Sequence, residues 1–178
     1  MRRVSFFTLG CKVNQYETQS IRESFLERGF LESAENDSDW CVINTCTVTS
    51  SADAKSRNII RHLIRKNPDS KIVVTGCLVA KDHKTLSEIK GIDYIISKSF
   101  FADSISDFKG RTRAFLKIQD GCDNFCSYCK VPYVRGLSRS RPEKDIINEA
   151  GLLAKKGFRE VVLTGICLGS YPGLARLV

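Results

Sequence analysis

The most constraining feature of this sequence is an alternation of short β-branched runs with segments of helical periodicity over residues 1–97. The apolar runs are VSFFTL, CVIN, KIVV and DYIIS, and helices are predicted between them at Gln15–Arg28, Asp53–Lys66 and Asp82–Lys90. Strands that alternate with helices form a parallel sheet with right-handed crossovers. The sequence therefore predicts an α/β fold that starts with an open parallel sheet flanked by helices.

A cysteine follows three of these four runs. The runs lead into VSFFTLGC at Cys11, CVINTC at Cys46 and KIVVTGC at Cys77. The C-terminal ends of parallel strands share one edge of a sheet, where such folds build their sites. We therefore expect these three cysteines to meet at that edge as metal ligands. The alternative for a single cysteine is a small buried hydrophobe, which we predict for Cys41 because it lies inside an apolar run.

A second unit is predicted to begin at residue 109, which divides the chain into domains 1–108 and 109–178. TRAFLKI is expected to form a strand, RPEKDIINEAGLLAKKG a helix, and REVVLTGI the next strand. This order is the first β-α-β of another parallel system. Since the sequence reaches Val178 soon afterwards, we expect the second unit to be incomplete and catalysis by these 178 residues alone to be weak or absent.

The predicted helix of the second unit has clear end signals. Ser140 and Glu143 have the spacing of a capping box, and Pro142 is expected in the first turn, where a missing N–H costs nothing. Gly157 is expected to end the helix.

The stretch GCDNFCSYC places Cys122, Cys126 and Cys129 within a short loop. A structural zinc ion takes four protein ligands, and the only histidines, His62 and His83, belong to the first unit. An iron–sulfur cluster held by three thiolates would leave one iron open, and an open metal position is a reactive one. The loop therefore predicts a metal centre at which a small molecule completes the coordination.

Charge and cysteine content restrict the partners and the compartment. The formal net charge is +8, and nine Lys and Arg against four Asp and Glu lie in the window 109–145. A second basic run on one helical face comprises Lys55, Arg57, Arg61, Arg65 and Lys66. Both features favour a polyanionic partner, with a solvated surface as the alternative. No apolar run is long enough to span a membrane, so we expect a cytoplasmic protein whose eight cysteines stay reduced rather than paired in disulfides.

The CxxxCxxC loop, with Tyr128 before its last cysteine, resembles the cluster loop of the radical S-adenosylmethionine enzymes. The resemblance implies a 4Fe-4S cluster on Cys122, Cys126 and Cys129, with S-adenosylmethionine bound at the open iron and Tyr128 beside it. In that family electron transfer from the cluster cleaves the cofactor and yields a 5′-deoxyadenosyl radical. These three cysteines are then the catalytic residues.

The segments TLGCKVNQYET, INTCTVTSSADAKSR and VVTGC resemble the N-terminal domain of the methylthiotransferases, which holds a second 4Fe-4S cluster on three cysteines. GCKVNQYET and GCDNFCSYCKVPYVRG resemble the branch that acts on threonylcarbamoyladenosine beside the tRNA anticodon. Assignment to this branch rests mainly on Lys12, Val13 and Asn14. Sibling branches, which act on isopentenyladenosine or on an aspartate of a ribosomal protein, are the alternatives, as is a non-catalytic metal-binding or RNA-binding module.

The resemblance implies that the cluster on Cys122, Cys126 and Cys129 starts hydrogen abstraction from the adenine. The cluster on Cys11, Cys46 and Cys77 then holds or delivers sulfur. It also implies an electron-donor protein and tRNA as partners, with no membrane and no DNA. The basic segment VRGLSRSRP after the loop is expected to meet RNA phosphate. Lys130 departs from the apolar residue usual in the family, and Cys167 is predicted to be an incidental thiol.

Overall fold

The computed structural model describes residues 1–97 and 104–177 and divides the chain into two compact units, Met1–Asp103 and Ser104–Val178. Part of the Phe100–Phe108 connection lies outside the described residues. The segment that follows belongs to the second unit, because Phe108 is buried and its ring packs edge-on to Phe115 at 5.2 Å. The boundary expected from the sequence lies a few residues later.

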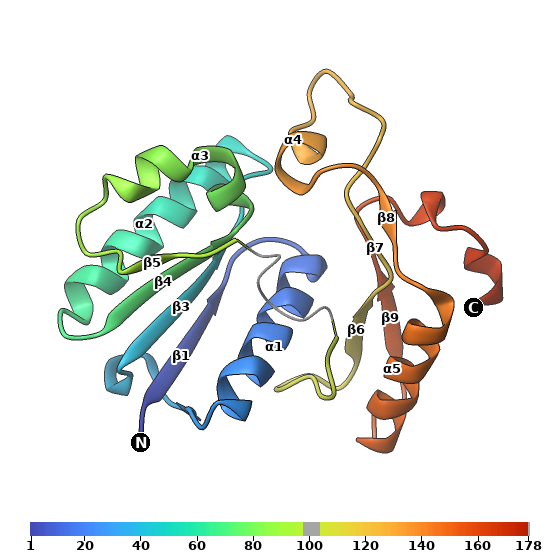
Figure 1. The fold of residues 1–178 in the computed structure, drawn as a ribbon, viewed down its shortest axis with the longest axis horizontal. Helices are drawn as coiled ribbons and strands as arrows, with labels where there is room; N and C mark the ends of the chain where they lie inside the picture. Colours follow the sequence, from blue (N-terminus) through green and yellow to red (C-terminus); the bar gives the residue numbers. More distant parts are fainter. Residues whose placement is uncertain (98–103, 178) are drawn as a thin grey trace. The chain divides into compact units, whose positions relative to one another are not determined.

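The first unit contains a five-stranded parallel sheet in the order β2-β1-β3-β4-β5 (Figure 1). The strands are β1 (Arg3–Thr8), β2 (Leu31–Glu32), β3 (Trp40–Thr45), β4 (Lys71–Gly76) and β5 (Tyr94–Ile95). The four strands expected from the sequence are confirmed, as is the open parallel sheet. Strand β2 was not expected; it is only two residues long and adds to the edge beside β1.

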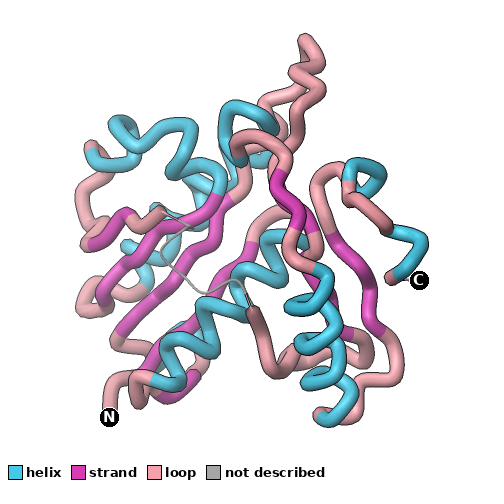
Figure 2. The backbone as a smooth tube through the Cα atoms, turned by 45° about the vertical axis from the view of Figure 1, so that its right-hand side comes forward, coloured by secondary structure: helices cyan, strands magenta, loops and turns pink. Residues whose placement is uncertain are grey.

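Helices cover both faces of this sheet (Figures 1 and 2). They are α1 (Lys12–Glu27), α2 (Ser50–Lys66) and α3 (Cys77–Ser87), and a short 3-10 helix spans Glu35–Asp37. On the α1 face, Val4, Ile21, Val42 and Val73 form one core cluster. On the other face, residues of α2 and α3 such as Ile60, Leu63 and Leu78 pack against Ile43 and Val74. Cys41 is fully buried in that second cluster, as its position in an apolar run predicts.

Helix α3 begins at Cys77, five residues before the predicted start at Asp82. Asp82 itself has a non-helical backbone, with φ −146° and ψ 50°, so the helix is kinked there. The prediction recognised only the part after the kink. The consequence is functional, because Cys77 becomes the first residue of a helix instead of a loop residue.

The second unit pairs β6 (Ala114–Lys117) in parallel with β9 (Val161–Thr164), and α5 (Glu143–Lys155) forms the crossover between them. A short antiparallel pair, β7 (Gln119–Asp120) with β8 (Arg139–Ser140), encloses the cysteine loop and the helix α4 (Val131–Arg135). Two further 3-10 turns span Leu168–Ser170 and Leu174–Arg176. The predicted β-α-β unit is confirmed. None of the helices in the described ranges 1–97 and 104–177 is long and apolar enough to cross a membrane.

The end signals of α5 are half right. Gly157 follows the last turn with φ +95°, and its N–H donates to Ala154 O at 2.9 Å, as a helix stop should. The predicted capping box is wrong. Ser140 lies in β8, in register with Gln119 of β7, and Pro142 occupies the N-cap position without a side-chain hydrogen bond. Strand pairing therefore overrides the local capping pattern.

Gly76 is the residue that lets the chain turn from β4 directly into α3. Its φ of +98° and ψ of −165° lie in a region essentially restricted to glycine. A Cβ here would stand 2.4 Å from both Asn44 Oδ1 and Thr45 O. Gly29 also has a positive φ, of +82°, but a Cβ there would meet nothing within 4 Å.

We expect Gly76→Ala to lower the free energy of unfolding of the first unit by about 3 kcal/mol or more, because strain and overlap add. Gly29→Ala is the matched control and should cost only about 1 kcal/mol. Urea unfolding followed by the fluorescence of Trp40, the only tryptophan, measures both. Equal losses of unfolding free energy in the two variants would show that the close contacts around Gly76 do not limit stability.

Candidate metal-binding cysteine sites

Cys11, Cys46 and Cys77 lie just beyond the C-terminal ends of the adjacent strands β1, β3 and β4. Thr45 is the register partner of Gly76, so Cys46 and Cys77 follow directly at the same level of two neighbouring strands. Cys11 stands three residues past Thr8, whose register partner is Asn44. Adjacent strands are about 4.8 Å apart. The sheet therefore brings the three cysteine backbones to one edge.

Close contact of the β1–α1 turn with Cys46 tightens this arrangement. A Cβ on Gly10, the neighbour of Cys11, would lie 3.1 Å from Cys46 Sγ. Gly10 has φ +108° and so has both a conformational and a steric reason to be glycine. Cys11 is exposed, whereas Cys46 and Cys77 are only 4% and 1% accessible. One thiol thus lies at the surface of the edge and two lie beneath it.

A buried asparagine pair fixes the backbone around these cysteines. Asn14 Nδ2 donates to Leu9 O and to Thr45 O, both at 2.9 Å, so it ties the β1 turn to the end of β3. Asn44 Nδ2 donates to Asn14 O at 2.9 Å. The Cys11 thiol lies 3.5 Å from Asn14 Oδ1. The sequence reasoning used Asn14 only as a marker of the branch and did not identify its structural role.

Residues of α2 and α3 support the turn after β3. Ser56 Oγ accepts the Cys46 N–H at 3.2 Å and donates to Cys46 O at 2.8 Å. Asp53 accepts from the Thr47 hydroxyl and forms an ion pair with Lys81, one turn after Cys77. These contacts join α2 both to the turn after β3, which carries Cys46, and to α3, which begins at Cys77.

The helices begin where the cysteines lie. Cys11 is the N-cap residue of α1, Cys77 is the first residue of α3, and α2 starts at Ser50 with Thr49 as its N-cap, its hydroxyl accepting the Ala52 N–H at 3.0 Å. The N-terminal end of a helix carries partial positive charge. Thiolates and the anionic clusters they bind are favoured there.

The second cysteine triplet lies in the loop between β7 and α4. Gly121 has φ +75°, and a Cβ on it would stand 2.0 Å from Leu137 O, so the loop passes against the β8 approach. Cys122 N donates to Gly136 O at 3.1 Å, and Cys129 N donates to Cys126 O at 2.9 Å. All three cysteines are partly exposed. The loop is thus pinned at its base and open at its tip.

Two aromatic residues mark the open side of this loop. Tyr128 is 87% exposed, and a hydrogen bond with Cys126 raises the pKa of its hydroxyl. Phe125 adopts φ 45°, which is unusual for a residue other than glycine. Its half-exposed ring packs edge-on against the ring of Tyr133, with 5.8 Å between the ring centroids. The predicted cofactor-binding position of Tyr128 is therefore accessible to a ligand.

Gln119 is a positioning residue that the sequence reasoning missed. Its side-chain amide donates to Gly121 O at 2.8 Å and to Ser138 Oγ at 2.9 Å, and its carbonyl accepts the N–H groups of Ile166 and Cys167. It is fully buried. A single side chain thus links the start of the cysteine loop to the end of β9. A lone glutamine in a strand gives no sequence signal for this.

The basic segment VRGLSRSRP differs from the prediction. Arg135 is buried and forms an ion pair with Asp120 at 2.9 Å, and Arg141 pairs with Glu149 at 2.5 Å. Asp120 also accepts the Gly121 N–H at 2.9 Å, so this ion pair supports the cysteine loop. Only Arg139 of the three arginines is exposed. The segment mainly stabilises the second unit and offers little charge to RNA.

The donor set of both triplets, three thiols each, is of the kind that an iron–sulfur cluster takes. All eight cysteines are free thiols, and His62 and His83 belong to the first unit but lie in the bodies of α2 and α3. Throughout residues 1–97 and 104–177, no three Cys, His, Asp or Glu side chains converge as ligands of one ion. A 4Fe-4S cube binds each thiolate through a different iron, so its ligands need not converge on one point.

Each of the two units matches a known protein family. Residues 3–97 match the sequence profile of "Uncharacterized protein family UPF0004", and residues 116–177 match "Radical SAM superfamily". The second match defines the class, a radical S-adenosylmethionine protein. The first match covers more than half of the sequence and shows that the chain belongs to the family UPF0004, and the second adds a radical S-adenosylmethionine region. The family resemblance of the cysteine motifs is confirmed.

Curated relatives agree with this assignment. The chain is 43% identical to a "Threonylcarbamoyladenosine tRNA methylthiotransferase MtaB" of Chlamydia pneumoniae, over 92% of the chain and 43% of the relative. It is 40% identical to the protein of the same name from Bacillus subtilis, over 96% and 45%. A "tRNA-2-methylthio-N(6)-dimethylallyladenosine synthase" of Thermodesulfovibrio yellowstonii is 34% identical, over 96% and 46%. The chain spans less than half the length of these relatives.

We expect Ser56→Ala to lower the free energy of unfolding of the first unit by about 1–3 kcal/mol, because the buried N–H and C=O of Cys46 both lose their hydroxyl partner. Ser51→Ala, an exposed position in the first turn of the same helix, is the matched control and should change it by less than about 0.5 kcal/mol. Urea unfolding with Trp40 fluorescence measures both. If the two variants were equally stable, Ser56 would not support Cys46.

Proposed function

We propose that the chain belongs to an enzyme that adds a methylthio group to threonylcarbamoyladenosine in tRNA, next to the anticodon. The observation that carries the proposal is the pair of cysteine triplets, one at the C-terminal edge of the parallel sheet in the first unit and one in the loop that follows β7 in the second. The names of the relatives support the reaction and the substrate class. An electron-donor protein completes the set of partners.

In the second unit, Cys122, Cys126 and Cys129 would hold a 4Fe-4S cluster with one iron left for S-adenosylmethionine. When bound, the cluster and the cofactor would supply a 5′-deoxyadenosyl radical, which takes a hydrogen atom from the adenine and becomes 5′-deoxyadenosine. Tyr128, on the open side of the loop, would contact the cofactor. Gln119 and the Asp120–Arg135 pair would hold the loop in place while the ligands exchange.

In the first unit, Cys11, Cys46 and Cys77 would hold a second 4Fe-4S cluster that binds or delivers the sulfur. Cys11 is exposed and would be the ligand nearest to solvent, whereas the buried Cys46 and Cys77 would hold the cluster from within the unit. The helix N-termini at this edge stabilise its negative charge. Asn14, Asn44 and Ser56 keep the three turns at a fixed spacing.

A second candidate is the branch that acts on dimethylallyladenosine, since one relative carries that name. The residues that favour the first branch contribute unequally to this choice. Val13 and Asn14 are both 1% accessible, so neither side chain is placed to contact a nucleoside. Lys12 is exposed and is the one of the three that a substrate can reach.

Iron content tests the two cysteine triplets directly. After anaerobic reconstitution of the full-length protein, we expect about eight irons per chain. We expect about four in Cys126→Ala and in Cys46→Ala, because each substitution removes a ligand of only one of the two clusters. Cys167→Ala is the control and should keep about eight. Loss of all iron in Cys126→Ala would contradict two independent sites, and zinc in place of iron would contradict the enzyme.

Analysis of tRNA nucleosides tests the substrate. In cells that lack the protein, mass spectrometry should find threonylcarbamoyladenosine without its methylthio group, while methylthiolated dimethylallyladenosine stays at its normal level. The wild-type gene should restore the missing product, and the Cys126→Ala gene should not. Loss of the dimethylallyl product instead would assign the second branch, and unchanged tRNA would exclude both.

A further inference from the structure

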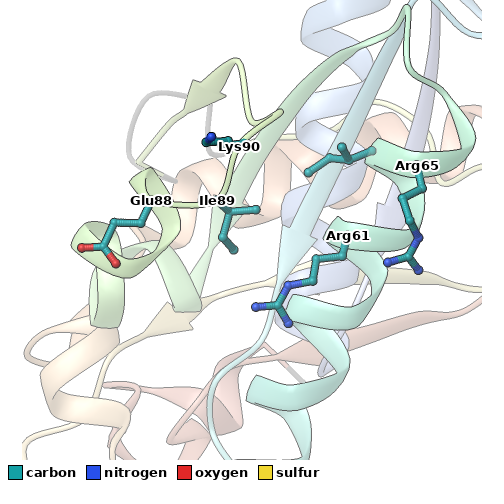
Figure 3. A pocket seen from close by; sticks show the side chains of 6 residues that line it. Arg61, Arg65, Glu88, Ile89 and Lys90 are labelled. Carbon is teal, nitrogen blue, oxygen red and sulfur yellow. The ribbon is translucent and has the colours of Figure 1, made fainter.

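A basic groove lies between α2 and the segment that follows α3 (Figure 3). It has a volume of about 380 Å³ and is lined by Arg61, Ile64, Arg65, Glu88, Ile89 and Lys90. Figure 3 shows both guanidinium groups on the same side of α2, with Ile89 facing that helix and the Glu88 carboxylate directed away. Its rim is therefore cationic and its floor apolar.

The geometry of α2 explains why the arginines act together. Arg61 and Arg65 are four residues apart, so they stand one above the other on one face of the helix. On the opposite wall, Gly91 has φ +96°, and a Cβ on it would lie 2.7 Å from Ile64 Cγ2. This close approach brings Lys90 next to the helix.

The groove keeps its positive charge. Within the described parts of the chain, none of Arg61, Arg65 and Lys90 forms an ion pair, and all three are exposed. The neighbouring basic residues of α2 differ, because Arg57 pairs with Asp82 at 2.6 Å and Lys66 pairs with Glu35 at 3.1 Å. The lining thus carries three cations and a single acid, Glu88.

This groove is separate from the cysteines of the same unit. Helix α2 starts at Ser50, close after Cys46, and Arg61 lies about 17 Å farther along its axis at 1.5 Å per residue. Helix α3 starts at Cys77 and also runs back along the sheet before the chain reaches Glu88. The groove therefore lies toward the opposite edge of the sheet.

We propose that this groove binds the phosphodiester backbone of the tRNA, as a contact remote from the modified nucleoside; the inference rests on the proposed function. Guanidinium groups pair with phosphate oxygens, and paired cations four residues apart on a helix suit successive phosphates. The lining has no buried polar side chain that could enclose a small phosphorylated metabolite. An extended polyanion therefore fits better than a small anion.

The test compares two double variants of the full-length protein. Arg61→Gln/Arg65→Gln removes two charges from the groove, and Arg2→Gln/Arg28→Gln removes two exposed charges elsewhere in the same unit. Binding of an anticodon stem-loop RNA is measured at several salt concentrations. We expect the groove variant to bind roughly tenfold more weakly at 0.15 M salt, with a salt slope smaller by about two, and the control to stay within about twofold of wild type.

Further measurements distinguish a lost RNA contact from a lost fold. Both variants should keep the unfolding midpoint and the iron content of wild type, and Glu88→Gln should strengthen RNA binding, because it removes the only acid of the groove. If the wild type and the control bind RNA and the groove variant binds equally well, the groove inference is overturned while the proposed function stands. If the wild type itself does not bind the RNA, both are overturned together.

Discussion

The parallel register of β1, β3 and β4 is the constraint on which the first unit depends. Because Asn44 is level with both Thr8 and Thr75, the three strands end together, and each turn that follows starts from the same edge. A slip of one residue would turn every side chain of a strand to the other face of the sheet. It would also move a cysteine away from its neighbours. Apolar packing on both faces of the sheet prevents such a slip.

Turns at that edge need small residues and buried amides as much as they need cysteines. Gly10 and Gly76 leave the room into which Cys46 and Asn44 pack, and Asn14 satisfies the carbonyls of two different turns. A buried carbonyl without a hydrogen-bond partner would lower the free energy of unfolding. The cysteines that we propose as metal ligands are therefore one part of a larger polar network.

In the second unit, charge supports structure before it serves binding. Arg135 and Asp120 form a nearly buried pair directly under the cysteine loop, and Arg141 and Glu149 join the segment after β8 to α5. Such pairs are strongly destabilising to break, since one charge would stay buried alone. Basic residues next to a cluster motif are thus a poor guide to an RNA surface. In the first unit the exposed arginines of α2 have no such task.

The sequence by itself determined the alternation of strands and helices, the parallel sheet, the β-α-β start of the second unit and the family, because periodicity and cysteine spacing are local properties of the chain. Only the tertiary structure decided which side chains support the cysteines and which charges stay free. Gln119, Ser56 and Asn14 act through partners distant in sequence, and no local pattern records such partners. The Ser140–Glu143 capping pattern failed for the same reason, since Ser140 lies in β8, in register with Gln119 of β7.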